Sequence, residues 1–380
     1  MSRFSSRTGW DLGESSFAES IRRARAEGRT LIDLTLSNPT VCGFHYDAEA
    51  ILTPLSDPRA LVYDPDPKGM RSAREAVASY YADHGADVDP DSIVLATSTS
   101  EGYGYLFRLL CDAGDEVLVA QPSYPLFNFL ADLEDVRLRP YPLFYDYGWW
   151  IDFAELESRI GPRTRAIVLV HPNNPTGHGT KGEERRRLEE ICARNGLALI
   201  VDEVFLDYPL NGEALESFAQ EPHRVPTFVL SGLSKIAGLP QVKVGWIATF
   251  APAVELGSAL GRLEVIADTF LSMNAPAQLA LPSWLASRAK IKKQILDRAL
   301  ANIRKIDGYG LGKLHCEAGW SAIIRLPRVG VGADRLLDEG VVVHPGSFYG
   351  MPEPERIVVS LIVPEEAFST GICTIAKAAS

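Results

Sequence analysis

The chain contains 380 residues, with 38 Lys and Arg against 49 Asp and Glu, so its net charge is −11. This acidic balance argues against nucleic acid as a partner. Hydrophobic residues make up 46% and charged residues 23%, which is close to the globular average and excludes disorder as the main state. Runs of about 18 apolar residues are absent, so we predict no membrane span and no signal peptide.

Cysteine usage indicates a reducing compartment. The five cysteines are odd in number and scattered, and none forms a C-x-x-C pair. This pattern argues against a disulfide framework and against structural zinc. We therefore predict a cytoplasmic protein without a metal site.

Short apolar runs alternate with helical stretches from about residue 93 to residue 249. Such runs are typical of strands buried on both faces, and the helices between them are typical of parallel crossover connections. The pattern predicts an α/β fold with a mostly parallel, doubly wound sheet. The predicted strands are residues 93–97, 117–120, 136–140, 166–170, 197–201, 227–230 and 242–249, with a helix at 181–195 that stops at Gly196.

The pattern changes after residue 249. Pro276 and Pro282 precede a long helical pattern at about residues 283–306, and shorter elements punctuated by Gly and Pro follow it. We predict a large domain over residues 46–255 and a smaller α+β domain over residues 1–45 and 256–380, with residues 283–306 as a long interdomain helix.

Polar residues follow four of the predicted strands, at the edge where an open parallel sheet binds its ligand. Ser98 and Thr99 open a helix after the first strand, which suits either a phosphate group or an ordinary N-cap. The sequence H-P-N-N-P-T-G at 171–177 contains Asn174 and suits either a rigid ligand loop or a simple turn. Asp202 follows the fifth strand, where an aspartate can cap a helix or hold a positive charge on a ring nitrogen.

A single lysine follows the sixth strand. Lys235 ends the small-residue turn S-G-L-S-K. Most lysines are solvated surface charges, but desolvation at a buried strand end lowers the lysine pKa and makes the amine a nucleophile for carbonyl groups. A lysine for a covalent link, an aspartate for a pyridinium nitrogen, an asparagine for a ring oxygen and a helix start for a phosphate together predict pyridoxal 5'-phosphate as the cofactor.

On these residues the chain resembles the fold-type I, class I and II pyridoxal-phosphate-dependent aminotransferases, from about residue 33 to residue 356. The resemblance implies that Lys235 carries the cofactor and moves the substrate proton, that Asp202 pairs with the ring nitrogen and that Asn174 donates to the ring oxygen. It implies further roles as follows: Ser37 and Asn38 lie over the substrate carboxylate, Ser98 and Thr99 bind the phosphate, Tyr124 stacks on the ring, and Arg356 of E-R-I-V-V-S clamps the substrate carboxylate.

The resemblance also implies a homodimer with shared active sites. Tyr63 of Y-D-P-D-P-K-G and Ser272 match positions that complete the phosphate site of the neighbouring subunit.

Three positions depart from the family pattern. Phe205 stands where the family usually has a tyrosine that donates to the ring oxygen, and Lys243 stands where an arginine normally contacts the phosphate. Gly232 takes the place of a serine that often binds the phosphate. Lysine keeps the charge of arginine but loses its bidentate fork, so we expect a cofactor site that differs in detail from the usual one.

The function that the resemblance implies is transfer of an amino group from an L-amino acid to a 2-oxo acid. Residues 266–271 contain Asp268 and no arginine, which predicts a neutral aliphatic or aromatic donor with Phe270, Leu271 and Tyr124 as apolar walls. The same scaffold also hosts C–S β-lyases, cyclising synthases and oxidative deaminases, and these stay open as alternatives. A regulatory domain that has kept the fold is a third class, but the chain has no basic DNA-binding extension.

Overall fold

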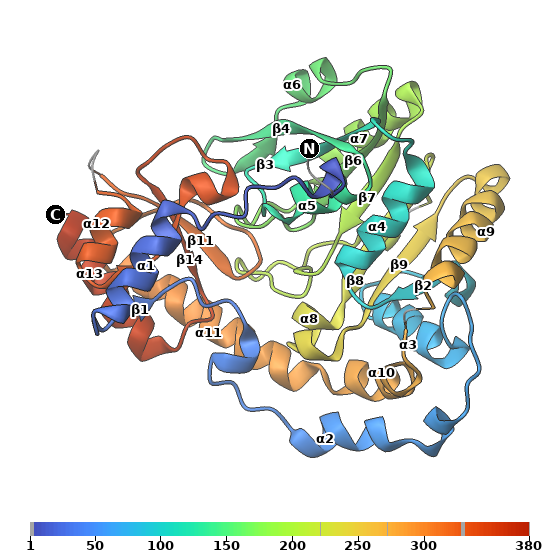
Figure 1. Cartoon of the computed structure of the whole chain (residues 1–380), viewed down its shortest axis with the longest axis horizontal. Helices are drawn as coiled ribbons and strands as arrows, with labels where there is room; N and C mark the ends of the chain where they lie inside the picture. The colour runs from blue at the N-terminus through green and yellow to red at the C-terminus, as the bar shows by residue number, and fades with distance from the viewer. Residues whose placement is uncertain (1–3, 221, 272, 328–330, 380) are drawn as a thin grey trace.

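The computed structural model describes residues 4–220, 222–271, 273–327 and 331–379, and the predicted contact at Ser272 lies outside this part of the chain. Figure 1 shows a larger lobe built around one sheet and a smaller lobe around β11 and β14. The helix α11 runs from the first lobe into the second. None of the helices in the described part of the chain has the length and apolarity needed to cross a membrane.

The large sheet has eight strands in the order β2-β9-β8-β7-β6-β3-β4-β5. The central pairs β3–β4, β3–β6, β6–β7 and β7–β8 are parallel, whereas β9 is antiparallel to both of its neighbours and β5 is antiparallel to β4. The predicted mostly parallel α/β sheet is therefore confirmed. The strands are β2 (Ile93–Ala96), β3 (Glu116–Gln121), β4 (Arg137–Tyr145), β5 (Trp149–Ile151), β6 (Thr164–Val170), β7 (Ala198–Asp202), β8 (Thr227–Gly232) and β9 (Gly245–Phe250).

Helices cover both faces of this sheet, which explains why its central strands are apolar on both sides. All residues of β7 and β8 are buried. One face packs on α3, α7 and α10, and the other packs on α4, α5 and α9. These helices are α3 (Arg71–Ala82), α4 (Thr99–Leu110), α5 (Leu126–Leu133), α7 (Gly182–Asn195), α9 (Ala253–Phe270) and α10 (Ala275–Ser287), with α2 (Ala48–Leu52) and α6 (Phe153–Ser158) at the periphery.

The smaller lobe has its own apolar core around a four-stranded sheet of order β10-β11-β14-β13 and a two-stranded sheet of β1 and β12. Its strands are β1 (Ile32–Asp33), β10 (Gly312–Lys313), β11 (Ser321–Arg325), β12 (Val341–Val342), β13 (His344–Pro345) and β14 (Arg356–Ser360). Its helices are α1 (Ser16–Ala26), α11 (Ala289–Gly308), α12 (Ala333–Asp338) and α13 (Glu365–Ala379).

The chain leaves the large lobe later than residue 255, the boundary predicted from the sequence. The helix α9 packs on α4 and α10 packs on α3, so both stay with the large sheet. The helix that leaves it is α11, which begins at Ala289 rather than 283. Pro282 lies inside α10, and the buried side chains of Trp284 and Leu285 hold the helix beyond it, because tertiary packing overrides the local preference of proline.

The first residues also differ from the predicted grouping of 1–45 with the smaller domain. The indole of Trp10 donates to Asp132 Oδ2 at 2.8 Å and packs edge-on against Phe129, with ring centroids 5.3 Å apart. These two partners belong to α5, so the segment before α1 packs on the large lobe. The chain from α1 onward packs within the small lobe, since β1 pairs with β12 and Leu34 and Cys42 belong to its core.

Candidate active site

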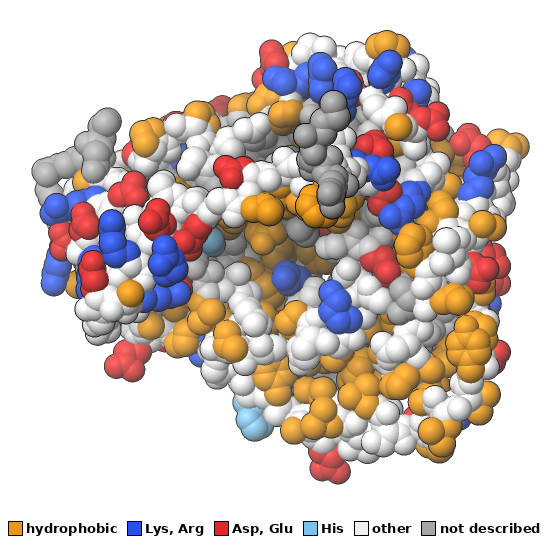
Figure 2. All heavy atoms as spheres, in the orientation of Figure 1, with side chains coloured by type: hydrophobic (Ala, Val, Ile, Leu, Met, Phe, Trp, Pro, Cys, Tyr) orange, Lys and Arg blue, Asp and Glu red, His pale blue; other side chains and the backbone are white. Residues whose placement is uncertain are grey.

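A cavity of about 620 Å³ lies where the carboxyl ends of β2, β6, β7 and β8 face the small lobe. Figure 2 shows the molecule hollowed between the two lobes. Because β9 is antiparallel to β8, its amino end also meets this edge. Residues from β11 and β14 form the opposite wall, so both lobes contribute to one site.

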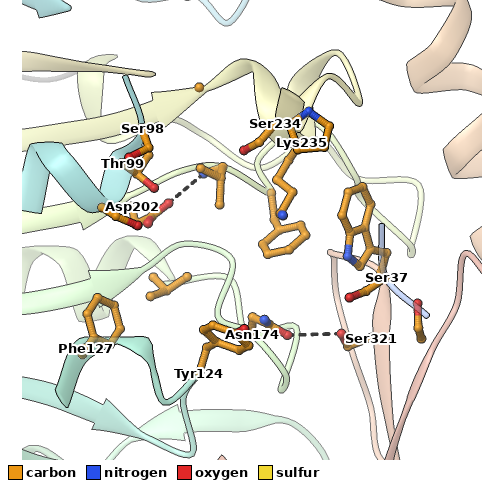
Figure 3. A pocket seen from close by; sticks show the side chains of 18 of the residues that line it. Ser37, Ser98, Thr99, Tyr124, Phe127, Asn174, Asp202, Ser234, Lys235 and Ser321 are labelled. Atoms are coloured by element: carbon orange, nitrogen blue, oxygen red, sulfur yellow. Dashed lines mark hydrogen bonds between the residues drawn. The ribbon is translucent and has the colours of Figure 1, made fainter. Parts of the chain in front are cut away.

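Lys235 extends into the middle of this cavity (Figure 3). The short helix α8 (Leu233–Ile236) follows β8 directly and fixes the direction of the side chain. The Nζ atom lies 5.8 Å from the ring centroid of Phe205 and 5.4 Å from that of Trp320. Burial lowers the pKa of Lys235, and the charge of Asp202 opposes this effect. The amine is thus suited to attack a carbonyl group.

Asp202 ends β7 and is buried at the large-lobe side of the cavity. Its carboxylate accepts a hydrogen bond from the Tyr103 hydroxyl at 3.2 Å and another from the backbone N–H of Val204 at 3.1 Å. Burial raises its pKa to about 6 despite these bonds. A cation placed beside it would restore the charged form, so the site is suited to a protonated ring nitrogen.

Asn174 is the asparagine of the 171–177 loop that faces the cavity. Its Oδ1 accepts from the Ser321 hydroxyl at 3.1 Å, which leaves its amide nitrogen to donate inward (Figure 3). The preceding Asn173 has a different role, because its side chain donates to Pro122 O at 3.0 Å and to Thr176 Oγ1 at 2.9 Å. One asparagine therefore fixes the loop while the other is available to a ligand.

The start of α4 forms one end of the cavity. Ser98 is the N-cap of this helix and accepts from the N–H of Glu101 at 3.2 Å, and Thr99 is its first residue. Ser234 and Lys243 line the same cavity. A helix start with hydroxyls and a lysine is a typical phosphate-binding arrangement.

Two glycines permit the close approach of β9 to this end. A Cβ on Gly245 would lie 2.9 Å from the carbonyl carbon of Ser98, and a Cβ on Gly232 would lie 2.7 Å from Val244 O. The second contact explains one departure from the family pattern, because a serine at 232 does not fit this backbone.

Aromatic residues surround the mouth of the cavity. Tyr124 is half exposed, and its ring centroid lies 6.2 Å from that of Phe348 and 6.4 Å from that of Tyr349. Phe205 is buried and packs edge-on against Trp320 at 5.1 Å. Both Tyr124 and Phe205 line the cavity, together with Ser37.

Three of the predicted residues do not line this cavity. Asn38 is exposed and caps a turn by accepting from the N–H of Thr40 at 3.1 Å. Tyr63 is 79% exposed and borders a second cavity of about 220 Å³. Arg356 lies at the start of β14, where its guanidinium pairs with Glu353 at 2.9 Å. Its Nε is buried without a partner, and Val358 and Ser360 on the same face of β14 line the cavity, so the role of Arg356 as a carboxylate clamp stays a prediction.

The cavity also contains residues that the sequence patterns did not indicate. Tyr103 lies inside α4, where helical periodicity marks it as a core residue, and it reaches Asp202 only through the packing of α4 on the sheet. Trp320 and Ser321 come from the other lobe. The only sequence signal at this point is a short apolar run after Gly319, which is typical of any strand.

Comparison with known proteins agrees with this geometry. The family described as Aminotransferase class I and II matches residues 29–367. The glutamate-pyruvate aminotransferase AlaA of Escherichia coli K12 is 27% identical over 357 residues, covering 88% of this chain and 87% of that protein. An alanine aminotransferase of Mycobacterium tuberculosis H37Rv is 28% identical over 360 residues, covering 88% and 82%.

The solved structures show the same fold. The alanine aminotransferase from Pyrococcus furiosus superposes with a TM-score of 0.88 at 21% identity, covering 99% of each chain. The chain belongs to the class I and II aminotransferase family. It is therefore an aminotransferase, and members of this family use pyridoxal phosphate.

The residues in the cavity fit that cofactor. Burial lowers the pKa of the Lys235 amine and raises the pKa of the Asp202 carboxyl to about 6. The hydrogen bond from Ser321 orients the Asn174 amide. The N-cap of α4 lies at the end of the cavity that is suited to a phosphate, beside Ser234 and Lys243. The donor set thus supplies one partner for each functional group of pyridoxal phosphate.

Proposed function

We propose that this protein is a pyridoxal-phosphate-dependent aminotransferase that moves the amino group of a neutral, aliphatic or aromatic L-amino acid to a 2-oxo acid. The observation that carries the proposal is the meeting of Lys235, Asp202 and Asn174 in one cavity with the start of α4. The three side chains stand at or just after the ends of three different strands, β6, β7 and β8, which makes a chance meeting a poor explanation.

Each side chain has a distinct part in the chemistry. The cofactor, when bound through Lys235, supplies a ring that withdraws electrons from the substrate Cα. Asp202 as a carboxylate keeps a proton on the ring nitrogen, and Asn174 donates to the ring oxygen. Lys235 would accept the proton from the substrate Cα and deliver it to the aldehyde carbon of the cofactor, because its amine lies in the cavity and has a lowered pKa.

The walls of the cavity support a neutral donor. Tyr124, Phe127 and Leu130 line it from the large lobe, and Phe348 and Val358 line it from the small lobe. The charged Lys and Asp side chains along its described lining are Lys235, Lys243 and Asp202, all of which the cofactor engages in this proposal. The AlaA relative is named for glutamate and pyruvate and the mycobacterial relative for alanine, which agrees with a small neutral substrate on one side of the reaction.

A half-reaction screen tests the proposal. Purified holoenzyme is mixed separately with alanine, methionine, phenylalanine and aspartate, and the loss of the aldehyde-form absorbance is followed together with the 2-oxo acid produced. We expect a neutral amino acid to convert the enzyme to its amino form fastest. A tenfold lead for aspartate would contradict the proposed specificity. Release of pyruvate and ammonia from cysteine-like substrates would favour a β-lyase instead.

We also propose a homodimer. Tyr63 borders the second cavity together with Leu271 and Met273, and its side chain is 79% exposed. The neighbouring side chains of Leu61, Val62 and Phe270 are also exposed and apolar. A second copy would cover this surface and bring Tyr63 to a phosphate site. Sedimentation velocity that finds an active monomer would refute this proposal.

A further inference from the structure

Tyr103 is a buried residue of the cavity whose hydroxyl bonds the carboxylate of Asp202. Its side chain is only 2% exposed, and the hydroxyl donates to Asp202 Oδ2 at 3.2 Å. The other oxygen, Oδ1, accepts from the backbone N–H of Val204 at 3.1 Å. Each carboxylate oxygen therefore has one donor, and the two donors together fix the orientation of the group. The backbone donor belongs to the turn after β7, whereas the hydroxyl comes from α4.

The helix α4 brings Tyr103 to this position. Thr99 and Tyr103 are four residues apart, which places them on one face of a helix, and both line the cavity. Gly102 allows this helix to lie close to the sheet, because a Cβ at that position would lie 2.5 Å from Leu230 Cδ2 of β8. One helix face thus provides the start of α4, which is suited to a phosphate, and a hydroxyl for Asp202 one turn later.

The ring of Tyr103 is held by two phenylalanines. Phe127 of α5 meets it edge-on, with ring centroids 5.0 Å apart, and Phe107 lies at 6.1 Å. Burial and the charge of Asp202 raise the pKa of Tyr103 well above its usual value. The phenol therefore keeps its proton at neutral pH and stays a donor to the charged carboxylate.

Two further groups act on the Asp202 carboxylate from other elements. Lys235 of α8 favours its charged form through its own positive charge. Tyr81 of α3 is close enough for the Asp202 charge to raise the pKa of its phenol. Within the described residues, the side-chain hydrogen bond to this carboxylate is the one from Tyr103.

Two neighbouring titratable groups face other partners. The ring of His171 lies with its Nε2 atom 3.1 Å from Arg185 Nη2, and the Glu203 carboxylate accepts from Ser217 Oγ at 2.7 Å. Neither His171 nor Glu203 is among the residues that line the cavity. Tyr103 is therefore the neighbour whose removal changes Asp202 most directly.

We propose that Tyr103 is a positioning residue, whose hydroxyl holds the Asp202 carboxylate in place and in its charged form for the ring nitrogen of the cofactor. This inference rests on the proposed function, because it concerns the group that meets the cofactor. A donor to a carboxylate favours the charged form. Without this hydroxyl, burial raises the pKa of Asp202 further above about 6, so that more of the carboxyl is neutral at neutral pH.

Cofactor binding to Tyr103→Phe at different pH values tests the proposal. The cofactor-free full-length protein is titrated with pyridoxal 5'-phosphate from pH 6.5 to pH 8.5, and the dissociation constant of the variant is divided by that of the wild type. This ratio removes the ionisation of the cofactor itself and that of Glu203. Loss of one hydrogen bond raises the midpoint by about one pH unit, so we expect the ratio to rise about threefold as the pH falls from 8.5 to 6.5. A ratio that is constant over this range would overturn the proposal.

Tyr141→Phe is the matched control. Tyr141 is also fully buried in the large lobe, but its hydroxyl donates to Val168 O at 3.1 Å, and neither residue lines the cavity. Both variants lose one buried phenol hydroxyl, so a merely structural effect would appear in both. We expect Tyr141→Phe to keep a constant ratio over the same pH range. The same pH trend in Tyr141→Phe would show a general loss of stability and would contradict the proposal.

A measurement on the cofactor-free protein separates this inference from the proposed function. Infrared difference spectra during a pH titration follow the C=O stretch of the protonated carboxyl, and the band missing in Asp202→Asn identifies Asp202. We expect its midpoint in Tyr103→Phe to lie about one pH unit above that of the wild type. If the midpoint moves but pyridoxal phosphate binds to neither protein, the proposed function fails while the control of Asp202 by Tyr103 stands. If the cofactor binds and the midpoints coincide, the inference fails and the proposed function stands.

Discussion

The two walls of the active-site cavity have opposite characters. The large-lobe wall carries an amine, a buried carboxyl and a helix start, all at the ends of strands in a sheet covered on both faces. The small-lobe wall carries hydroxyls, an indole and aliphatic side chains from β11 and β14. In the proposed function the large-lobe wall therefore holds the groups that engage the cofactor, whereas the small-lobe wall faces the substrate.

Burial has different consequences on the two sides. On the large-lobe side it lowers the pKa of Lys235 and raises that of Asp202, so both groups are tuned for proton transfer and charge pairing. On the small-lobe side it lowers the pKa of His344, which favours the neutral imidazole. Substitutions at the large-lobe wall and at the neighbouring Glu203 test whether the reaction chemistry depends on that side of the cavity.

The largest effect is expected for Lys235→Ala. If the chemistry depends on this one amine, the variant loses the borohydride-reducible link to the cofactor, and turnover falls by on the order of a thousandfold or more. Mass spectrometry of the reduced protein measures the link. Lys243→Ala is the matched control, because it removes a lysine from the same cavity and is expected to keep the adduct. An adduct that maps to another lysine in the wild type would contradict the assignment.

Asp202→Asn is expected to weaken cofactor binding by roughly a hundredfold near pH 7.5, because a buried charge loses its partner. In the wild type the affinity should fall as the pH drops through about 6, where Asp202 becomes protonated. The variant should lack this part of the pH dependence. Titration of the cofactor-free protein from pH 5 to pH 8 measures both, with Asp146→Asn as an exposed control. Identical pH profiles for Asp202→Asn and the wild type would remove Asp202 from the site.

Glu203, the residue after Asp202, is a second buried carboxyl at this sheet edge, and its burial makes the stability of the fold depend on pH. It accepts from the N–H of Phe218 at 2.6 Å and from Ser217 Oγ at 2.7 Å, yet burial raises its pKa to about 7. Because the folded pKa exceeds the unfolded value of 4.5, its contribution to stability is complete below pH 4.5 and is lost as the pH rises through 7.

We therefore expect Glu203→Gln to reduce the fall in melting temperature between pH 5 and pH 8 by a few degrees, on the order of 5 °C. Thermal unfolding of the holoenzyme at both pH values measures this difference. Glu216→Gln, an exposed change nearby, should leave the difference as it is. An unchanged pH dependence in Glu203→Gln would show that Glu203 titrates alike in the folded and unfolded chains.

The smallest effect is expected for Phe205→Tyr. Its ring lies 5.8 Å from the Lys235 amine, so a phenol here is placed to donate toward the ring oxygen of the cofactor. One such hydrogen bond, worth about 1.5 kcal/mol, should lower the spectroscopic pKa of the Lys235–cofactor chromophore by roughly one unit. Absorbance titration measures the shift, and Phe205→Leu serves as the control without a hydroxyl. A rise, or no change, would show that the phenol does not reach the cofactor.

The local sequence predicts the strands that carry most of the large-lobe wall. Continuous apolar runs fixed the strands, because only strands covered on both faces bury every residue. Because the carboxyl ends of parallel strands meet at one edge of the sheet, the sequence predicts that Asn174, Asp202 and Lys235 lie close together. The end of α7 is also determined locally, because its C-cap residue has a φ of +63°, a conformation that favours glycine, and Gly196 stands at that position.

Only the tertiary structure decided the small-lobe wall and the division between lobes. The position of Arg356 depends on the register of β14 against β11, and a shift of two residues keeps the same strand face while moving a side chain by nearly 7 Å. The sequence motif does not contain that register, because the connection from Arg325 to Arg356 is some thirty residues long and includes α12, β12 and β13. The contact of Trp10 with Asp132 of α5 and the contact of Trp320 with Lys235 are likewise long-range. Both depend on packing between elements that are distant in the sequence, which no local pattern specifies.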